Sequence, residues 1–409
     1  MIITDHKIYK SLVTKNDKKI VLLVMDGLGG LPLTPEGLTE LETAKTPNLD
    51  ALAKEGMSGR SVPVRPGITP GSGPAHLSLF GYDPIQFDIG RGVLEALGIG
   101  FDLGPNDVAA RGNFATADAE GRIIDRRAGR IPTETCIRLT EKLQANTSLA
   151  EDGVEVIVKP VKEHRFAVIF RGEGLGGELT ETDPLVTGKA PLPVRDLSHT
   201  PEGERTARLI NKWVEQARRV LADEERANSL NLRGIAKDPG LPQFSELYQL
   251  KAAAIAAYPM YKGVAKLVGM KVIDFEGVRP HHEIAALKQV WDAYDFFFIH
   301  IKKTDSYGED GNFEAKVHEI EAVDAIIPDI LALGPDVLIV TGDHSTPAKL
   351  HSHSSHPVPT LFWGSGILPD QVSSFGERAS EQGSLGRFHA TEIMMQALGA
   401  TDRLKRYGA

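Results

Sequence analysis

Three acidic residues follow apolar runs that are typical of buried strands, and together they suggest a metal site. The runs Ile20–Met25, Phe296–Ile301 and 337–340 lead into Asp26, Asp305 and Asp343, respectively. In an open α/β sheet, ligands bind outside the carboxyl ends of the strands, so we expect these acids to converge. Clustered carboxylates repel one another unless a cation neutralises them, and their convergence therefore implies a metal. The alternative is that each aspartate merely begins a loop.

Histidines accumulate directly after the third of these acids. Four of the 13 histidines of the chain lie in one short segment, namely His344, His351, His353 and His356. Imidazole combined with carboxylate suits Zn²⁺ or Mn²⁺ better than Ca²⁺. A solvated histidine-rich loop is the alternative, which is weakened because the segment follows a strand that ends in Asp-His. We expect two of the four to be ligands and the others to be exposed or to support the ligands.

A serine in a turn rich in glycine and proline is the candidate nucleophile. Residues 69–76 read TPGSGPAH, where Gly71 and Gly73 allow a tight turn and Pro74 favours a helix start just after it. Ser72 would then lie at a helix N-terminus, where backbone amides favour an anion. A serine hydroxyl is a weak nucleophile until a base or metal lowers its pKa, and the predicted metal site would do so. The alternative is an ordinary turn that Ser72 caps.

Basic residues in the middle of the chain form a candidate anion pocket. Arg126, Arg127 and Arg130 fall within six residues, and the residues that could add to them are His164, Arg165 and Arg233. In an acidic protein, a local arginine cluster can hold a phosphate or a carboxylate through bidentate hydrogen bonds. The alternative is that these arginines lie on a solvated turn.

The glycine run at 172–177 matches the spacing of a dinucleotide-binding fingerprint but not its context. That fingerprint needs a strand, the glycines and then a helix. The residues that follow the run, ELTETDP, do not predict a helix. We therefore reject a dinucleotide site at this position.

The elements that must position these residues predict an α/β fold. Short apolar runs bounded by charge, glycine or proline are typical of buried parallel strands, with helices between them covering both faces of the sheet. The predicted strands are Ile20–Met25, Phe296–Ile301, 337–340 and 359–363. The predicted helices include Pro47–Glu55, with Thr46 as N-cap and Pro47 as its first residue, and 315–331.

The middle of the chain predicts a separate α+β domain. Residues 154–158 and 165–170 alternate like strands, and the charged stretch 202–228 carries apolar residues at helical spacing. We therefore expect one α/β domain built from residues 1–98 and 243–409. A second domain, residues 99–242, is inserted into it. A length of 409 residues is compatible with two or three domains.

The composition excludes several classes of protein. The chain has 46 lysines and arginines and 55 aspartates and glutamates, so its formal net charge is −9, which argues against a broad nucleic-acid surface. One cysteine, Cys136, permits neither an internal disulfide nor a thiolate zinc site. No stretch approaches 18 apolar residues, and the first 20 residues lack the apolar region of a secretory signal. We expect a cytoplasmic protein without nucleic-acid or membrane partners.

Several segments resemble those of the alkaline phosphatase superfamily. They are 24–27 (VMDG), 70–76 (PGSGPAH), 341–344 (TGDH) and 353–359 (HSSHPVP). Within that superfamily the chain most resembles the archaeal-type 2,3-bisphosphoglycerate-independent phosphoglycerate mutases. The resemblance extends to 111–114 (RGNF), 125–130 (DRRAGR), 164–166 (HRF), 182–184 (TDP) and 258–263 (YPMYKG), and so covers nearly the whole chain from Lys19 onward.

This resemblance implies an alkaline-phosphatase-like core, two divalent metal ions and a phosphoserine intermediate on Ser72. The residues that match ligands of one metal are Asp26, Ser72, Asp343 and His344, and those that match the other are Asp305 and His353. The implied metals are Mn²⁺, Zn²⁺, Co²⁺ or Mg²⁺, and 2,3-bisphosphoglycerate is not required. The implied substrate-binding residues are Arg111, Arg126, Arg127, Arg130, His164, Arg165, Asp183, Arg233 and Lys262.

The implied reaction interconverts 3-phosphoglycerate and 2-phosphoglycerate, a step of glycolysis and gluconeogenesis. Ser72 takes the phosphoryl group, the inserted domain retains glycerate while it reorients, and the other hydroxyl then takes the phosphoryl group back. Metals and arginines would supply most of the electrostatic stabilisation. Closure of the insert would exclude the water that otherwise causes hydrolysis.

The chain departs from this family at one predicted ligand. The family usually has a histidine four residues after the acid that matches Asp305, and this chain has Glu309. Within one helical turn both carboxylates would share a face and could bind one metal, with a preference shifted from Zn²⁺ toward Mn²⁺ or Mg²⁺. The alternative is that Glu309 points to solvent and that His351 or His356 completes the site.

Two other functions are compatible with the same residues. A metal-dependent phosphomonoesterase or phosphonate hydrolase would use the same metals and serine. The arginine cluster favours the mutase because it suits a carboxylate-bearing substrate held through a transfer. A non-catalytic protein that binds a phosphorylated metabolite is the third possibility, against which Ser72, Asp343 and His344 argue. The sequence leaves the oligomeric state open.

Overall fold

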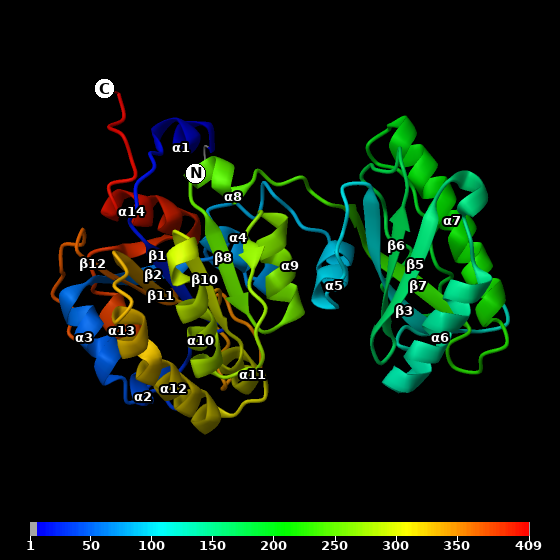
Figure 1. Ribbon diagram of the computed structural model, residues 1–409. Helices are drawn as coiled ribbons and strands as arrows, with labels where there is room; N and C mark the ends of the chain where they lie inside the picture. The colour runs from blue at the N-terminus through cyan, green and yellow to red at the C-terminus, as the bar shows by residue number, and fades with distance from the viewer. Residues whose placement is uncertain (1–5, 409) are drawn as a thin grey trace. The chain divides into compact units, whose positions relative to one another are not determined.

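The computed structural model describes residues 6–408, which fall into two compact units (Figure 1). The first unit comprises Met1–Asp88 and Leu241–Ala409, and the second comprises Ile89–Gly240. The second unit thus begins ten residues before the predicted insert and ends two residues before its predicted end. It begins earlier because helix α5 (Arg91–Gly98) packs on three strands of the second unit. The first five residues of the N-terminal segment predicted not to be a secretory signal lie outside the described range.

An eight-stranded mixed sheet forms the centre of the first unit. The strand order is β13-β2-β12-β11-β1-β10-β8-β9. The strands are β1 (Ile20–Met25), β2 (Met57–Val62), β8 (Ala252–Ala256), β9 (Lys271–Val272), β10 (Phe296–Ile301), β11 (Val337–Thr341), β12 (Val358–Gly364) and β13 (Gly386–His389). Strand β1 is parallel to both of its neighbours, β10 and β11. All six of its residues are buried, which requires cover on both faces of the sheet.

The predicted parallel strand at 359–363 is present as β12, but the predicted direction is wrong. Strand β12 runs antiparallel to both β11 and β2. A parallel neighbour needs a crossover, usually a helix, whereas no helix lies between β11 and β12. A strand buried on both faces has the same apolar pattern in either direction, so the pattern could not reveal the direction.

Helices flank this sheet, and the two predicted ones are present. Helix α3 spans Pro47–Glu55 as predicted, although the side chain of Thr46 makes no capping hydrogen bond. Helix α12 spans Phe313–Leu331 and begins two residues before the prediction, because the side chain of Asn312 accepts a hydrogen bond from the amide of Ala315. The other helices of this unit are α1 (His6–Leu12), α2 (Glu40–Thr43), α4 (Ser72–Leu79), α8 (Phe244–Tyr248), α9 (Pro259–Leu267), α10 (Pro280–Val290), α11 (Lys303–Glu309), α13 (Glu377–Ser380) and α14 (Ile393–Ala400).

The second unit is an α+β domain with its own core. Its antiparallel sheet has the order β4-β3-β6-β5, and β7 pairs with β3. The strands are β3 (Asp107–Ala117), β4 (Ile123–Asp125), β5 (Glu155–Lys162), β6 (Arg165–Arg171) and β7 (Ser229–Lys237), and the helices besides α5 are α6 (Thr133–Asn146) and α7 (Pro201–Leu221). Phe170 and Trp213 meet edge to face in this core, with their ring centroids 5.6 Å apart. The predicted elements at 154–158, 165–170 and 202–228 correspond to β5, β6 and α7.

The elements bear on the rejected dinucleotide site and on membrane-spanning helices. The glycine run at 172–177 follows β6 and leads into a loop that contains no helix before Pro201, so the context of a dinucleotide fingerprint is missing. Across residues 6–408, none of the helices is long and apolar enough to cross a membrane.

A buried carboxyl in the first unit gives a prediction for the pH dependence of stability. Glu283 of α10 is 2% exposed, and burial, together with the negative charge of Glu319, raises its pKa to about 7. The folded chain therefore prefers the protonated carboxyl. This contribution to stability is fully present below the ordinary value of 4.5 and is lost as the pH rises through 7.

We expect Glu283→Gln, which stays neutral, to raise the free energy of unfolding by about 2 kcal/mol at alkaline pH and to change it little near pH 4.5. Urea denaturation of both proteins at the two pH values measures the difference. The exposed Glu225→Gln serves as the control. A gain of equal size at both pH values would contradict the assignment.

Candidate metal centre and arginine pocket

The predicted metal-binding acids lie at the ends of three adjacent parallel strands. Asp26 follows β1, Asp343 and His344 follow β11, and Asp305 lies in the first turn of α11, just beyond β10. All four side chains are almost completely buried. Gly27 makes the turn after β1 with a φ of +64°, and a Cβ there would lie only 2.8 Å from the carboxylate of Asp305. Glycine thus allows the two acid-bearing segments to approach each other.

Asp26, Asp343 and His344 form the first candidate metal group. The Nε2 atom of His344 lies 3.3 Å from Oδ1 of Asp26, 3.1 Å from Oδ2 of Asp343 and 3.2 Å from Oγ of Ser72. These two carboxylate oxygens are buried and have no hydrogen-bond partner within the described chain. Buried anionic oxygens without donors are costly, and a divalent cation would satisfy both. The donor set of this group therefore fits a metal.

The tautomer of His344 suits a metal ligand. The hydroxyl of Thr346 donates to Oδ1 of Asp305 at 2.7 Å, so its oxygen is free to accept from Nδ1 of His344 at 2.9 Å. A proton on Nδ1 leaves the lone pair of Nε2 directed at the first group. Thr346 thus sets the orientation of the imidazole.

The two carboxyls of the first group have opposite pKa shifts. For Asp26, burial favours the neutral form, but Lys302 and His300 outweigh it and hold the pKa well below its usual range. For Asp343, burial and then the charge of Asp26 raise the pKa well above its usual range. The negative charge of Asp26 therefore opposes ionisation of Asp343. A bound divalent cation would relieve this repulsion and allow both carboxyls to ionise.

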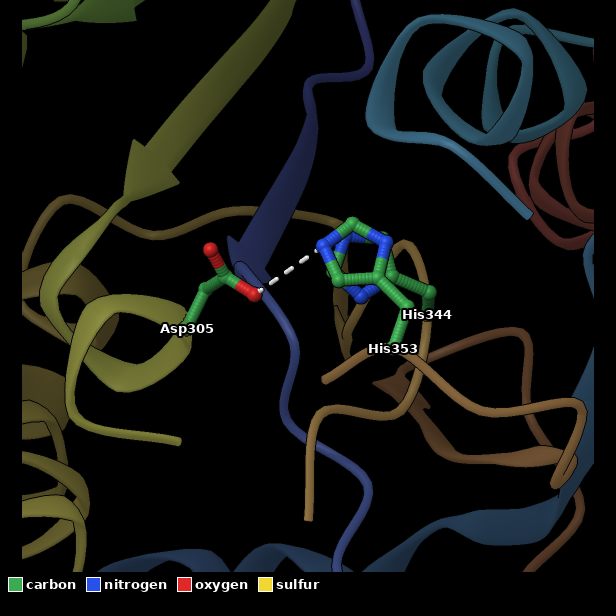
Figure 2. A group of neighbouring side chains, drawn as sticks. All are labelled: Asp305, His344 and His353. Carbon is green, nitrogen blue, oxygen red and sulfur yellow. Dashed lines mark ion pairs between the residues drawn. The ribbon is translucent and has the colours of Figure 1, made fainter. Parts of the chain in front are cut away.

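Asp305, His344 and His353 form the second candidate metal group (Figure 2). Nε2 of His353 lies 3.5 Å from Oδ1 of Asp305, and the ring of His353 stacks on that of His344 with centroids 3.7 Å apart. Nδ1 of His353 donates to the carbonyl oxygen of Pro70 at 2.9 Å, which leaves the Nε2 lone pair free to bind a metal. The segment that carries Ser72 thereby orients a residue of the second group.

Glu309 lies beside this second group but is not part of it. It is the last residue of α11, its side chain is 55% exposed, and its Oε1 lies 3.7 Å from Nε2 of His353. Burial and the charge of Asp305 raise its pKa. Of the other candidate histidines, His351 is exposed and His356 bonds with the hydroxyl of Ser354, and neither belongs to a metal group in the described chain.

Ser72 is the first residue of α4, with Gly71 as its N-cap. The helix starts three residues earlier than the start predicted just after Pro74, so that prediction is wrong. The backbone of Gly71 is extended, with a φ of −87°. The serine is half-buried, and Nδ1 of His76, one turn along the helix, donates to its carbonyl oxygen at 2.8 Å.

Sequence reasoning did not assign roles to several residues that support the centre. Lys302 contacts Asp26 and Asp305, His300 donates to Oδ2 of Asp26 at 3.1 Å, and Nδ1 of His76 lies 3.3 Å from Oδ2 of Asp343. Burial and then the charge of His300 lower the pKa of His76 to about 3. A signal was available for His300, since it is the one ionisable residue in the apolar run FFFIHI.

A buried lysine joins the loops that carry the acids. Nζ of Lys316 donates to the carbonyl oxygens of Gly27, Gly29 and Thr346 at 2.9, 3.1 and 2.9 Å. It is fully buried and lies 3.7 Å from the carboxylate of Glu40. Lys316 therefore fixes the loop after β1 against the loop after β11. Its place within α12 gave no sign of this role.

In the second unit, most of the predicted substrate-binding residues line one cavity of about 400 Å³. The lining residues are Arg111, Asn113, Arg126, Arg127, Arg130, Glu163, His164, Arg165 and Arg233. Six arginines face one acid, so the cavity is strongly positive. A concave site of this composition fits an anion with more than one charged group.

Asp183 and Lys262 are the two predicted substrate-binding residues that do not line this cavity. The buried carboxylate of Asp183 instead makes two hydrogen bonds with Arg126, at 3.1 and 2.7 Å, and lies 3.8 Å from Nε of Arg233. It therefore holds two arginines in place. Lys262 belongs to α9 of the first unit.

Like charges crowd the cavity. Burial lowers the pKa of Arg111, and the positive charges of Arg165 and Arg233 lower it further. The negative charge of Glu95 acts in the opposite direction. Burial and the charge of Arg165 likewise lower the pKa of His164. A bound anion would relieve this repulsion.

The loop that carries three of the arginines has a strained backbone. Ala128, Gly129 and Arg130 have φ values of +48°, +63° and +51°, and only glycine adopts such values without cost. The carboxylate of Asp125 holds the loop by accepting from the amides of Arg127 and Gly129. Strain of this kind is concentrated at functional sites, so it supports a binding role for the loop.

The fold and the first centre together define a class of protein. A serine hydroxyl lies beside two carboxylate–imidazole groups at the carboxyl ends of the strands of an α/β sheet. This arrangement is expected of a metal-dependent enzyme that transfers or hydrolyses phosphoryl groups. The class alone does not distinguish a mutase from a phosphatase.

Comparisons with known proteins identify the family. The model of the family "2,3-bisphosphoglycerate-independent phosphoglycerate mutase" matches residues 53–227. A probable 2,3-bisphosphoglycerate-independent phosphoglycerate mutase of Thermus thermophilus is 53% identical over 404 residues, which cover 98% of this chain and 99% of the relative. The solved cofactor-independent phosphoglycerate mutase from Thermoplasma acidophilum is 33% identical with a TM-score of 0.72, covering 93% of this chain and 100% of that one. A solved Pyrococcus horikoshii protein is 31% identical with a TM-score of 0.78, covering 97% and 100%.

This chain therefore belongs to the 2,3-bisphosphoglycerate-independent phosphoglycerate mutase family, which makes it an isomerase. The family is the one that the sequence motifs predict.

Proposed function

We propose that the chain interconverts 3-phosphoglycerate and 2-phosphoglycerate in the cytoplasm through a phosphoserine on Ser72, with two divalent metal ions. The observation that carries this proposal is the convergence of Ser72 Oγ, His344 Nε2 and the unpartnered oxygens of Asp26 and Asp343. Divalent cations, when bound, supply positive charge that favours the ionised serine and the charge developing on the transferring phosphoryl group.

The chain's residues divide the metal binding between two groups. Asp26, Asp343, His344 and Ser72 would hold one ion, and Asp305 and His353 would hold the other. Oxygen and imidazole donors fit Mn²⁺, Zn²⁺, Co²⁺ or Mg²⁺.

Ser72 acts as the nucleophile in the proposed reaction. Its Oγ forms a bond to phosphorus while the bond from phosphorus to the substrate oxygen breaks, and that oxygen takes up a proton. In the second half the other hydroxyl of the bound glycerate loses a proton and attacks phosphorus, which releases Ser72. The first residue of α4 is suited to this role because the free amides of the helix N-terminus stabilise the phosphoryl oxygens.

The arginine cavity would bind the phosphoglycerate and retain glycerate between the two transfers. Its guanidinium groups match the carboxylate and phosphate of the substrate, since both anions accept paired hydrogen bonds. Asp183 supports this role by fixing Arg126. Lys262 is proposed to contribute a further positive charge.

The direct test is to incubate the purified protein with 3-phosphoglycerate and to measure both 2-phosphoglycerate and free phosphate. We expect 2-phosphoglycerate to be the main product, with no need for 2,3-bisphosphoglycerate. Dominant release of phosphate would instead favour a phosphomonoesterase on the same core. Stoichiometric metal binding without any turnover would favour a non-catalytic binding protein.

Lysine substitutions test the arginine cavity. A lysine keeps the charge but loses the planar paired donors, so we expect Arg127→Lys or Arg130→Lys to raise KM for 3-phosphoglycerate about tenfold and to increase the leak to free phosphate. We expect Arg126→Lys also to lose its double contact with Asp183. Steady-state kinetics with both products measured provides the readout. Arg122→Lys, at an exposed ion pair with Asp118, is the control. If all three variants match the wild type, the cluster is only a solvated turn.

We further propose that Glu309 completes the second metal group. Its Oε1 lies 3.7 Å from Nε2 of His353, the proposed ligand on that side of the group. Burial and the charge of Asp305 raise the pKa of Glu309 despite the opposing charges of Lys302 and His353, and a bound divalent cation would favour its ionised form. A carboxylate in place of an imidazole makes the site harder and favours Mn²⁺ or Mg²⁺ over Zn²⁺.

We expect Glu309→Ala to lose about one metal per chain and most of the activity, and Glu309→His to keep the metal but shift the preference toward Zn²⁺. Metal content by mass spectrometry and activity with each ion provide the two readouts. The neighbouring exposed Asp310→Ala is the matched control. Two tightly bound metals and normal turnover in Glu309→Ala would mean that another group closes the site.

A further inference from the structure

Lys302 occupies the space between the two candidate metal groups. Its Nζ lies 3.1 Å from Oδ2 of Asp26, which belongs to the first group, and 2.5 Å from Oδ2 of Asp305, which belongs to the second. The side chain is 18% exposed, and its ammonium lies 5.5 Å from the centre of the Tyr261 ring. One cation therefore touches an acid of each group.

Each of these carboxylates divides its two oxygens between different partners. Oδ1 of Asp26 faces Nε2 of His344 at 3.3 Å, and Oδ1 of Asp305 faces Nε2 of His353 at 3.5 Å. Both Oδ2 atoms face Lys302. The ammonium thus binds the carboxylates on the side away from His344 and His353, sharing Oδ2 of Asp26 with His300, and leaves the Oδ1 atoms directed into the two metal groups.

The charges of the centre require a cation even before any metal binds. Asp26, Asp305 and Asp343 are nearly fully buried within one small region. Among the ion pairs of the described chain, Lys302 is the only lysine or arginine that reaches the first two of these acids. Without it, their mutual repulsion would oppose folding of the strand ends.

We infer that Lys302 is a built-in counter-cation that keeps both metal groups assembled in the metal-free protein and thereby lowers their affinity for metal. The inference rests on the proposal that the two groups bind divalent cations. Lys302 acts through the carboxylates and is a positioning residue. Its charge repels an incoming divalent cation, while its two contacts preserve the geometry that the cation needs.

Removing the charge of Lys302 should lower the stability of the metal-free chain but raise its affinity for metal. These opposite effects distinguish a counter-cation from a residue with a merely structural role. The metal-free chain should lose stability, because the acids then lack a cation. The same loss should tighten metal binding, because a divalent cation no longer competes with the ammonium and relieves a larger repulsion. A residue that only supports the fold would weaken both stability and metal binding when replaced.

The test compares Lys302→Met with Lys302→Arg, which keeps the charge, and with Lys303→Met, which removes a charge from the next residue. The first readout is the melting temperature in excess chelator and in saturating Mn²⁺. The second is the Kd for Mn²⁺ by isothermal titration calorimetry. For Lys302→Met we expect the melting temperature in chelator to fall by at least 5 °C, most of this loss to be recovered in Mn²⁺, and Mn²⁺ to bind at least fivefold more tightly. Lys302→Arg and Lys303→Met should bind Mn²⁺ within about twofold of the wild type.

Weaker Mn²⁺ binding by Lys302→Met, or an unchanged melting temperature in chelator, would overturn the inference. If Lys302→Met folds only when Mn²⁺ is present, the counter-cation role is supported in its strongest form. If it folds under neither condition, Lys302→Gln, which keeps a hydrogen-bond donor without the charge, is measured in its place against the same expectations. Absence of Mn²⁺ binding by the wild type would instead overturn the proposed metal function.

Discussion

Replacing Ser72 with alanine is expected to abolish the interconversion of 3-phosphoglycerate and 2-phosphoglycerate, with a loss of at least about 10³-fold in kcat. The reason is that its Oγ is the nucleophile of the proposed reaction and lies at the first candidate metal group, 3.2 Å from Nε2 of His344. Thr346 has a hydroxyl nearby, but that hydroxyl already donates to Asp305 and accepts from His344. It is therefore not available to replace the serine.

The fold should survive this change. Ser72 is half-buried at the first position of α4, and no side-chain cap depends on it, so the cost in stability should be within about 0.5 kcal/mol. Thermal melting checks this expectation. Ser78→Ala, in the same helix, is the matched control for a lost hydroxyl and should remain active.

A second measurement identifies the intermediate directly. Stopping the wild-type enzyme with acid during turnover should trap phosphate on Ser72, which peptide mass spectrometry can locate. The phosphate should be absent from Ser72→Ala under the same conditions. Phosphate on a histidine such as His76 or His344, or on no residue of the wild type, would contradict the serine mechanism.

The convergence of the acids could be predicted because it depends only on strand order and direction. Asp26, Asp305 and Asp343 each follow an apolar run at the same end of a parallel strand, and β11, β1 and β10 are neighbours in the sheet. Apolar runs separated by predicted helices indicate such strands without any knowledge of side-chain packing. The arginine cluster could be predicted for a different reason, since three of its arginines fall within six residues of the sequence.

Features that depend on three-dimensional packing were not predictable. The direction of β12 is determined by the connection that precedes it, which an apolar pattern does not encode. The contacts of Lys302 and Lys316 arise where separate loops meet, and an isolated lysine in a helix or after a strand is usually solvated. The pairing of Arg126 with Asp183 joins residues 57 positions apart. The family resemblance implies that both residues bind substrate, and it gave no sign that their side chains also bind each other.

The second unit begins ten residues before the predicted insert for a related reason. Helix α5 (Arg91–Gly98) precedes the strands of the second unit and shows no change in composition. Its place is decided by packing on β3 and β7, since a Cβ on Gly92 would lie 2.2 Å from the carbonyl oxygen of Ala109. Close packing at a glycine of this kind becomes visible only in three dimensions.

Removing divalent metals is expected to eliminate the activity and to destabilise the chain. Dialysis against a strong chelator leaves the buried oxygens of Asp26 and Asp343 without partners, and Lys302 then offsets only part of the charge repulsion of the centre. Metal that binds only the folded state stabilises it, by about 2.7 kcal/mol when the free ion is at 100 times its Kd. We therefore expect a lower melting temperature in chelator and its recovery when the ion is returned.

The ions that restore activity should follow the donor set of the two groups. The proposed ligands Asp26 and Asp343 offer oxygens, and His344 and His353 offer imidazole nitrogens. Mn²⁺, Co²⁺ or Zn²⁺ should therefore restore turnover much better than Ca²⁺, which prefers six to eight oxygen ligands. Activity measured after adding each ion to the stripped enzyme, without 2,3-bisphosphoglycerate, checks the order. Mg²⁺ is the informative comparison, because efficient recovery with Mg²⁺ would favour a carboxylate-rich second group that includes Glu309. Full activity of extensively stripped enzyme would show that the acids at the strand ends serve some purpose other than binding a catalytic metal.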